Sequence, residues 1–529
     1  MTSDRARWLL LAIAALALVL HSLAYNFVTD DAYISFVYSR NLAEHGELSF
    51  NLGHPVEGYT NFLWTVILGL LMIPGIAPEI SSRVLGTACA LATLYVVFRT
   101  MERALGKKSL WATVPPLLLA CSSGFACWTS GGLETQLFTL LVAVAIDGLV
   151  AAEDVAGERA LYRAGIALAL AAMTRPEGLL VAAVIGVVRL ACNALARRRI
   201  VGKTELVAAA CFLGVWAPWF AWRWWYYGWP FPNTYYVKAT GKWASPAMAS
   251  EMWKHGGYYL WVWLRQTRLV YALPLAIVGI AAVRPRTPRF ALALACALLA
   301  AVYLPYAASV GGDFMGLHRF IMPMFVVAAI TVVLGLERIA RHRIAAIAAP
   351  IVLVLAFAGT QVLLTRDSLR WGNFAADHGV IDTPAFLMVY TEDRAAIGRA
   401  MERCFSPGDF SIVGGAGAQP YFGRMRGIDV FGLVSERIAH EEPRIRARAG
   451  HTKFGSDSLL AQYDPTFVFS CYAIHPTPTP PALPCNVGFW TQRGYEPITM
   501  RIPGMKQMGE YYTFLAKKSR NFQCPGRVP

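Results

Sequence analysis

Long apolar runs recur along the first two thirds of the chain, separated by short polar or basic segments. A membrane-spanning helix needs roughly 20 mostly apolar residues. The runs therefore predict about eleven spanning helices, at 8–25, 81–98, 110–127, 135–152, 160–174, 176–194, 204–226, 269–283, 290–308, 320–336 and 344–364. A shorter run at 62–76 is predicted to be an interfacial, juxtamembrane helix instead.

Basic residues between the runs set the expected orientation. They form four clusters: Arg99, Arg103, Lys107 and Lys108; Arg197, Arg198, Arg199 and Lys203; Arg284, Arg286 and Arg289; and Arg338, Arg341 and Arg343. Positively charged loops stay in the cytoplasm, and the clusters share one side only if 62–76 lies along the membrane surface. We expect a multi-pass plasma (inner) membrane protein with an uncleaved first helix, a cytoplasmic N-terminus and an extracytoplasmic C-terminus.

The last third of the chain has a different character. Strand-like runs at 410–413, 466–469 and 511–515 alternate with polar, proline-rich connections, which predicts a soluble α/β domain. We place an all-α membrane domain at 1–365, with its first external loop at 26–79, and the extracytoplasmic domain at 366–529. The four cysteines of the second domain face an oxidising compartment and are expected to form two disulfides, with the pairing open: Cys404, Cys471, Cys485 and Cys524.

Composition supports the membrane class. Of 529 residues, 56% are hydrophobic and 15% charged, whereas soluble chains are roughly 25% charged. The net charge of +15 would suggest a nucleic-acid partner in a soluble protein, but here most of the basic excess is explained as an orientation signal. The motifs of zinc proteases, P-loop ATPases and α/β-hydrolases do not occur in the sequence.

Two adjacent carboxylates, Asp30 and Asp31, follow the first spanning helix. One interpretation is that they stabilise the N-terminus of the next helix, where negative charge is favourable. The other is a catalytic carboxylate at the membrane–water boundary, because neighbouring carboxylates raise one pKa and a carboxylate acts as a general base toward a hydroxyl. Tyr33 and Arg40 follow on the same predicted helix.

Further polar clusters lie on the same predicted side of the membrane. Their candidate members are Glu57, Tyr59, Asn61, Glu134, Arg175, Glu177, Asn233, Tyr235, Lys238, Asp313, His318 and Arg319. Simpler interpretations are a helix cap for Asn61 and a buried salt bridge for Arg175 with Glu177. Lys238 and Arg319 are suited to hold a phosphate. Together the clusters suit an anionic lipid headgroup and a polar acceptor. The loop Gly414-Gly415-Ala416-Gly417 lacks the full dinucleotide spacing and is predicted to be a turn.

Several of these segments resemble bacterial GT-C-fold glycosyltransferases, and in particular the mycobacterial terminal β-(1→2)-arabinofuranosyltransferases. The resemblance covers about 1–340 and rests on Asp30-Asp31-Ala-Tyr33-Ile-Ser-Phe, Val56-Glu57-Gly-Tyr59-Thr-Asn61-Phe-Leu-Trp-Thr, Gly132-Leu-Glu134-Thr, Thr174-Arg175-Pro-Glu177-Gly, Asn233-Thr-Tyr235-Tyr-Val-Lys238 and Gly311-Gly-Asp313.

The resemblance implies a membrane enzyme that transfers a sugar from a polyprenyl-phosphate donor, at the outer face and with inversion, to a cell-envelope glycan, lipid or protein in cell-wall biogenesis. Asp30 or Asp31 would act as base, and Lys238, Arg319 and Arg175 would hold the leaving phosphate. Sugar and acceptor would be bound by Glu57, Glu134 and Asn61, with Tyr33, Arg40, Tyr59, Glu177, Asn233, Tyr235, Asp313 and His318. The sequence requires no cofactor, but some relatives need a divalent metal, which the carboxylate pair can hold.

Two other functions fit the same pattern. A transporter or flippase of a lipid-linked sugar would also place charges near the membrane, although most interior runs lack ionisable residues and no inverted repeat is evident. A non-catalytic envelope scaffold would use the C-terminal domain to bind partners.

Overall fold

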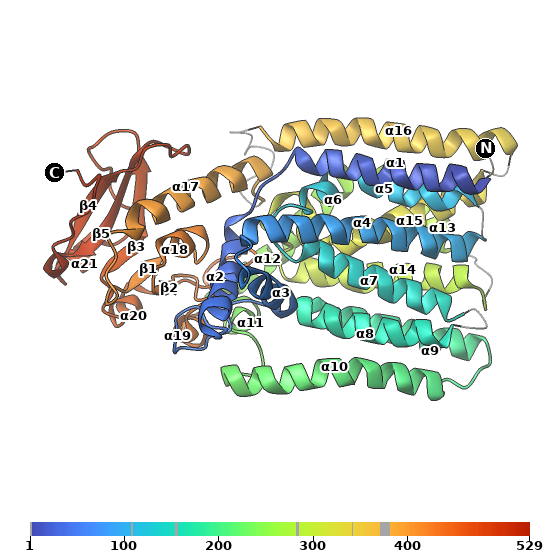
Figure 1. Ribbon diagram of the computed structural model, residues 1–529, viewed down its shortest axis with the longest axis horizontal. Helices are drawn as coiled ribbons and strands as arrows, with labels where there is room; N and C mark the ends of the chain where they lie inside the picture. Colours follow the sequence, from blue (N-terminus) through green and yellow to red (C-terminus); the bar gives the residue numbers. More distant parts are fainter. Residues whose placement is uncertain are drawn as a thin grey trace.

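A computed structural model of the chain describes residues 3–106, 109–153, 157–281, 285–340, 342–370 and 381–528. A bundle of helices running side by side carries a smaller domain with a β-sheet at one end (Figure 1). The N-terminus and the α9–α10 connection, with its basic cluster, lie at the opposite end of the bundle (Figure 1). Members of the other basic clusters, namely Lys107, Lys108, Arg284 and Arg341, lie outside the described residues.

The bundle helices coincide with the predicted spans. They are α1 (Ser3–Leu23), α4 (Pro78–Leu105), α7 (Thr135–Ala151), α8 (Glu158–Thr174), α9 (Glu177–Leu195), α10 (Lys203–Tyr227), α13 (Leu269–Ile280), α14 (Pro288–Ser309), α15 (Met322–Ile339) and α16 (Arg343–Ser368). In the described part of the chain, seven helices are long and apolar enough to cross a membrane: α1, α4, α9, α10, α14, the segment Gly316–Ile339 that contains α15, and α16. The other predicted spans are shorter helices, and α16 continues past the predicted domain boundary at 365–366.

The outer helices show how the bundle meets its surroundings. On α16, Ile344, Ile351 and Leu355 are each more than half exposed, and Trp225 on α10 is 79% exposed. Soluble monomers rarely leave such continuous apolar surface uncovered. These faces are therefore suited to contact lipid.

The predicted span 110–127 is not one helix, which corrects the sequence prediction. It consists of η1 (Leu110–Thr113), α5 (Val114–Cys121) and α6 (Ser123–Cys127), with Ser122 in an extended conformation between α5 and α6. The Ser122 hydroxyl accepts a hydrogen bond from Phe125 N, and the Ser123 amide donates to the side chain of Gln361 on α16. Polar side chains thus satisfy backbone groups that the break would leave unpaired.

Further helices lie where the bundle meets the C-terminal domain. The segment 26–79, predicted to be the first external loop, contains α2 (Asp30–His45) and α3 (Phe62–Met72), and the segment 227–268 contains α11 (Asn233–Ala239) and α12 (Pro246–Gln266) (Figure 1). Between the predicted spans 204–226 and 269–283 no helix was predicted, so α12 is an addition to the sequence prediction. Its start is nevertheless encoded locally, because Ser245 Oγ accepts from Ala247 N and Pro246 occupies the first turn.

The C-terminal domain is built on a five-stranded sheet in the order β2-β1-β3-β5-β4. Its strands are β1 (Ser411–Val413), β2 (Gly427–Asp429), β3 (Phe467–His475), β4 (Tyr495–Arg501) and β5 (Tyr511–Lys517), and its helices are α17 (Pro384–Glu402), α18 (Ala418–Gly423), α19 (Glu436–Glu441), α20 (Asp457–Ala461) and α21 (Val487–Thr491). β1 pairs in parallel with β2 and β3, whereas β5 is antiparallel to β3 and β4. The three predicted strands are confirmed. β4 was missed because it contains Pro497, which is tolerated since β4 is an edge strand.

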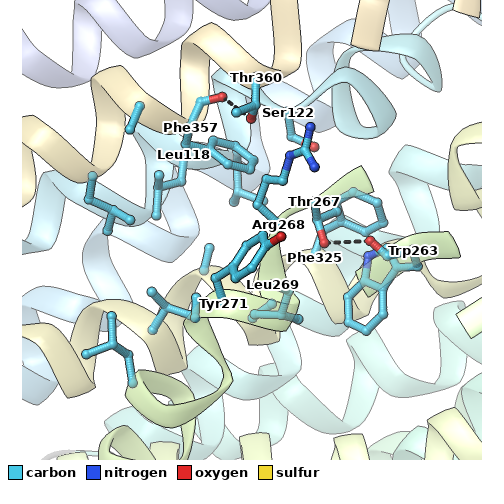
Figure 2. Close-up of a pocket in the computed structure, with 18 residues that line it drawn as sticks. Leu118, Ser122, Trp263, Thr267, Arg268, Leu269, Tyr271, Phe325, Phe357 and Thr360 are labelled. Atoms are coloured by element: carbon cyan, nitrogen blue, oxygen red, sulfur yellow. Dashed lines mark hydrogen bonds between the residues drawn. The ribbon is translucent and has the colours of Figure 1, made fainter. Parts of the chain in front are cut away.

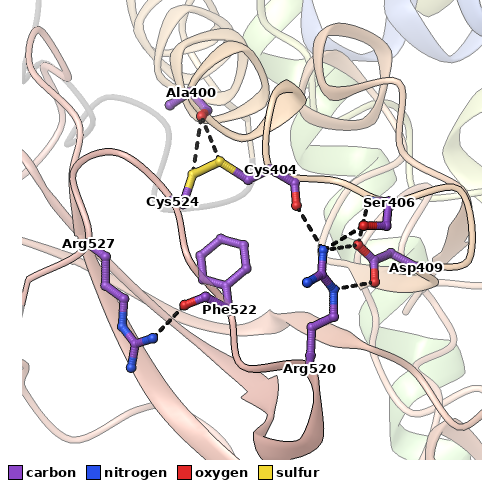
Figure 3. Close-up of a disulfide and its surroundings, with 8 residues drawn as sticks. All are labelled: Ala400, Cys404, Ser406, Asp409, Arg520, Phe522, Cys524 and Arg527. Atoms are coloured by element: carbon purple, nitrogen blue, oxygen red, sulfur yellow. Dashed lines mark hydrogen bonds and ion pairs between the residues drawn. A yellow bond between two sulfur atoms is a disulfide. The ribbon is translucent and has the colours of Figure 1, made fainter.

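Both expected disulfides form, and the structure supplies their pairing. Cys404 at the end of α17 bonds to Cys524 near the end of the chain (Figure 3), and Cys471 in β3 bonds to Cys485. Beside the first bridge, Arg520 pairs with Asp409 at 2.9 Å. The bridges therefore fix the two ends of the C-terminal domain to each other and the β3 strand to the following loop.

Candidate functional site

Asp30 and Asp31 form the first turn of α2, directly after the chain leaves α1. The N-cap residue, Thr29, makes no side-chain capping hydrogen bond. The two carboxylates lie near the positive end of the helix dipole, as the simpler interpretation expected. Residues 32–39 of α2 are all buried, so α2 is an interior element that holds the pair in fixed positions.

Asp30 is held by the C-terminal domain. Its Oδ1 accepts a hydrogen bond of 2.8 Å from the backbone amide of Ala418, the first residue of α18. Gly417 lies so close that a Cβ there would collide with the carboxylate and carbonyl of Asp30. Burial raises the pKa of Asp30 to about 6, while the Ala418 amide acts in the opposite direction.

Asp31 faces a different environment. It is half-buried and accepts no hydrogen bond that the described residues provide. Burial raises its pKa, and the positive charges of Arg319 and Lys238 oppose that rise. Adjacent residues on a helix point in different directions, so the two carboxylates have separate partners.

Lys238 lies in the last turn of α11, near Asp31, Arg319 and Asp313, and is accessible to solvent. Burial lowers its pKa, and the nearby charge of Asp31 counteracts that effect. A lysine in this setting is available to an anionic ligand.

Arg319 is fixed by the turn η2 (Gly316–Ile321) between α14 and α15. Its Nε pairs with Asp313 Oδ2 at 3.0 Å, and its guanidinium lies 5.7 Å from the ring centre of Trp128. Leu317 and His318 have φ angles of 57° and 62°, a conformation that few non-glycine residues adopt. The Trp128 indole donates to Gly316 O at 3.1 Å and helps to hold this turn.

A second ion cluster continues from this group. Arg175 pairs with Glu134 at 2.7 Å and with Glu177 at 3.2 Å, so the salt bridge expected for the 175–177 turn is present. Asn61 donates to Glu134 at 2.9 Å and accepts from Ser35 of α2 at 3.0 Å. Asn61 occupies the N-cap position of α3 but makes no capping hydrogen bond. This network joins four segments that are distant in sequence.

Other candidate residues are tied to the domain interface or to the bundle. Glu57 pairs with Arg223 at 3.3 Å, and burial raises the pKa of Glu57 to about 8. The Tyr59 hydroxyl bonds to that of Tyr227 at 2.9 Å. Asn233 donates to Gly432 O at 2.7 Å in the C-terminal domain.

The remaining candidate residues are also tied to the domain interface or to the bundle. Arg40 donates to Tyr421 O at 2.8 Å, and the Tyr33 ring lies 5.1 Å from the Tyr421 ring. His318 bonds to Gln266, and Tyr235 packs against Phe231. The structure thus brings Asp31, Lys238, Arg319 and Asp313 together. The sugar and acceptor roles assigned to the outlying residues stay predictions.

A cavity of about 330 Å³ lies between the start of α2 and the C-terminal domain. Asp30 and Asp31 line one wall; Gly415, Arg446, Arg448 and His451 are among the residues of the other. The residues of this second wall were not among the predicted site residues. One signal was present, since the glycine-rich loop follows β1 at the carboxyl end of a parallel strand, where ligands commonly bind. The loop is a turn, as predicted, but it closes over Asp30.

A second cavity of about 310 Å³ lies among α5, α13, α15 and α16 and is lined mostly by apolar side chains. Figure 2 shows Arg268 reaching into it close to Ser122. Among the residues that the structure describes, no group of three or more His, Cys, Asp and Glu side chains is arranged to hold a metal ion. Asp30 and Asp31, the carboxylates that the resemblance offers for a divalent metal, have separate partners, and the metal stays a prediction.

Comparison with solved structures identifies the fold. ArnT from Cupriavidus metallidurans in the apo state matches with a TM-score of 0.58 at 13% identity, covering 98% of this chain and 99% of ArnT. The structure of ArnT bound to undecaprenyl phosphate matches with a TM-score of 0.56 at 14% identity, covering 82% and 87%. The chain therefore has the GT-C fold that its sequence motifs indicated. No family model and no curated protein matches the sequence.

Proposed function

We propose that the protein is a membrane glycosyltransferase that transfers a sugar from a polyprenyl-phosphate donor to an acceptor hydroxyl of the cell envelope. The observation that carries this proposal is the position of Asp31. It lies beside Lys238 and Arg319 where an apolar helix bundle meets a polar cavity. A lipid-linked phosphate sugar needs cations, a base and an apolar surface, and this arrangement offers all three.

In the proposed reaction, the acceptor oxygen attacks the anomeric carbon while its proton passes to the Asp31 carboxylate. The bond between the anomeric carbon and the phosphate oxygen breaks. The leaving polyprenyl phosphate is bound by Lys238 and Arg319, and Arg175 adds positive charge nearby. The attack inverts the anomeric configuration. The raised pKa of Asp31 suits this role, because a base is most effective when its pKa approaches the working pH.

We assign Asp30 a different task. Its carboxylate already accepts a hydrogen bond from the Ala418 amide and packs against Gly417. The carboxylate of Asp31 has no such bond from the described residues and can receive a proton. Asp30 would therefore anchor the C-terminal domain over the site and keep α2 in place, and Asp31 would be the base.

Two lines of support bear on the donor. The related fold of ArnT has been solved with undecaprenyl phosphate bound, and the apolar cavity between α5 and α16 can accommodate an isoprenoid chain. For the sugar, the first-loop motifs favour arabinofuranose. Polyprenyl-phosphate arabinofuranose should therefore be turned over faster than the matching mannose donor.

The test is donor turnover by the purified full chain with Asp31→Asn, Asp30→Asn and the surface control Asp464→Asn. Loss of a general base lowers rates by roughly 10²–10⁴-fold, so we expect that loss in Asp31→Asn. Asp30→Asn should lose less, and Asp464→Asn nothing, because Asp464 is 77% exposed and its ion pair among the described residues is with Lys517, far in sequence from the site. Wild-type turnover in Asp31→Asn would reject Asp31 as the base, and absence of donor turnover by the unmodified chain would favour a transporter or flippase of the lipid-linked sugar.

A further inference from the structure

One wall of the 330 Å³ cavity is a segment of the C-terminal domain, residues 444–453, that is fastened to the membrane domain. The Thr452 hydroxyl donates to Val237 O of α11 at 2.7 Å, and the His255 ring of α12 bonds to Ala447 O at 2.5 Å. Arg444 donates to Lys238 O at 2.8 Å. These bonds hold the segment in a defined position opposite Asp31.

Two arginines of this segment have hydrogen-bonding capacity that the described protein atoms do not use. Arg448 pairs with Asp382 at 3.0 Å through one terminal nitrogen, while its Nε is buried without a partner in the part of the chain that the structure describes. Arg446 is exposed, lies 6.0 Å from the ring centre of Phe454 and forms no ion pair with a described carboxylate. The side chain of Arg448 is 40% exposed, and both arginines line the cavity, so their guanidinium groups can bind a phosphate or carboxylate there.

The same wall offers aromatic surface. The His451 ring lies 4.8 Å from that of Phe314 and 4.5 Å from that of Phe431. Since Ala449 O can only accept, the 3.1 Å contact with His451 Nδ1 places the proton there and leaves Nε2 as an acceptor. Burial, with Arg448 nearby, lowers the pKa of His451 to about 4, so the ring is neutral at pH 7.

We propose that this wall binds the acceptor, and that the acceptor is a sugar unit bearing a phosphate or carboxylate. Arg446 and Arg448 bind the negative group, and the Phe314–His451–Phe431 surface contacts the sugar ring and accepts one of its hydroxyls. This inference rests on the proposed function, because it assigns the second reactant of the same site. The donor phosphate is assigned separately to Lys238 and Arg319, which lie near Asp31 and are not among the described residues that line the cavity.

The test uses the full chain in phosphatidylcholine nanodiscs, saturated first with undecaprenyl phosphate so that Lys238 and Arg319 are occupied. Glucose 6-phosphate and glucuronate are then titrated by calorimetry, with uncharged glucose as the control ligand. We expect both charged sugars to bind more tightly than glucose. Arg446→Ala and Arg448→Ala should each weaken that binding about tenfold or more, since charge-assisted hydrogen bonds are lost. Arg437→Ala, an exposed arginine paired with Glu441, is the matched control.

Unchanged affinity in Arg446→Ala and Arg448→Ala would overturn the proposal, as would equal affinity for glucose and glucose 6-phosphate. Loss of sugar binding in phosphatidylglycerol nanodiscs would overturn the sugar assignment in favour of a lipid headgroup. Slow hydrolysis of the donor without acceptor separates the two claims. It requires Asp31, so its loss in Asp31→Asn and its retention in the surface variant Arg437→Ala support the proposed function even if the acceptor subsite fails.

Discussion

At the scale of single residues, the pair Asp30–Asp31 shows how neighbours in sequence acquire different roles. Asp30 is bonded to Ala418, and the pKa of Asp31 responds to Lys238 and Arg319. The difference arises because a helix rotates by about 100° per residue, so adjacent side chains meet different walls. From their residue type and position in the sequence alone, the two carboxylates are equivalent.

Gly417→Ala tests the contact between Asp30 and the C-terminal domain. A Cβ at this position would overlap the Asp30 carboxylate and its backbone oxygen, which would displace the start of α2 and with it Asp31. Misplacement of a reacting group by about 1 Å can lower a rate roughly 100-fold, so donor turnover should fall by about 10- to 100-fold. Gly408→Ala is the control, since a Cβ there meets open space. Equal rates in the two variants would contradict the positioning role.

At the scale of elements, most helices and strands form where the local sequence predicts them. The exceptions are places where tertiary contacts or the position in the sheet make another conformation stable. The apolar run 110–127 breaks at Ser122 because Gln361 of α16 bonds the freed amide of Ser123. β4 forms in spite of Pro497 because it lies at the sheet edge. The end of α17 is further joined to the end of the chain by Cys404–Cys524 (Figure 3), and β3 to the following loop by Cys471–Cys485.

The disulfides should differ in their contribution to stability. The Cys404–Cys524 bridge spans 120 residues of sequence and the Cys471–Cys485 bridge spans 14. Chain-entropy estimates give about 5 kcal/mol for the longer loop and about 3 kcal/mol for the shorter. Replacing both cysteines of the first pair by alanine should therefore lower the urea midpoint for proteolysis of the C-terminal domain, in the full chain, more than replacing the second pair. The reverse order would show that native-state contacts, not loop entropy, dominate.

At the scale of the whole molecule, the C-terminal domain lies at one end of the bundle, and the N-terminus and the α9–α10 connection with its basic cluster lie at the other (Figure 1). The apolar outer faces of α10 and α16 lie between these ends. This arrangement agrees with the prediction that the basic α9–α10 loop lies on the opposite side of the membrane from the C-terminal domain. The direction of the bundle in the membrane is a prediction of the charge pattern.

Cysteine labelling tests that direction. Thr479→Cys, in an exposed loop of the C-terminal domain, should react with a membrane-impermeant maleimide in intact spheroplasts. Arg199→Cys, in the exposed α9–α10 connection, should react only after the membrane is permeabilised. The unmodified chain gives the background. Labelling of Arg199→Cys alone in intact spheroplasts would reverse the orientation and place the catalytic groups in the cytoplasm.

The sequence by itself predicted most of the spanning segments, an interfacial helix at 62–76 and a common side of the membrane for Asp30, Asp31, Lys238 and Arg319. These are local properties, because apolar length and loop charge act through contact with the membrane at each segment. Only the tertiary structure decided which carboxylate is free, and that the C-terminal domain supplies half of the cavity. The bond between Asp30 and Ala418 joins residues 388 positions apart. Such contacts depend on how the whole chain packs, and no local pattern of polarity encodes them.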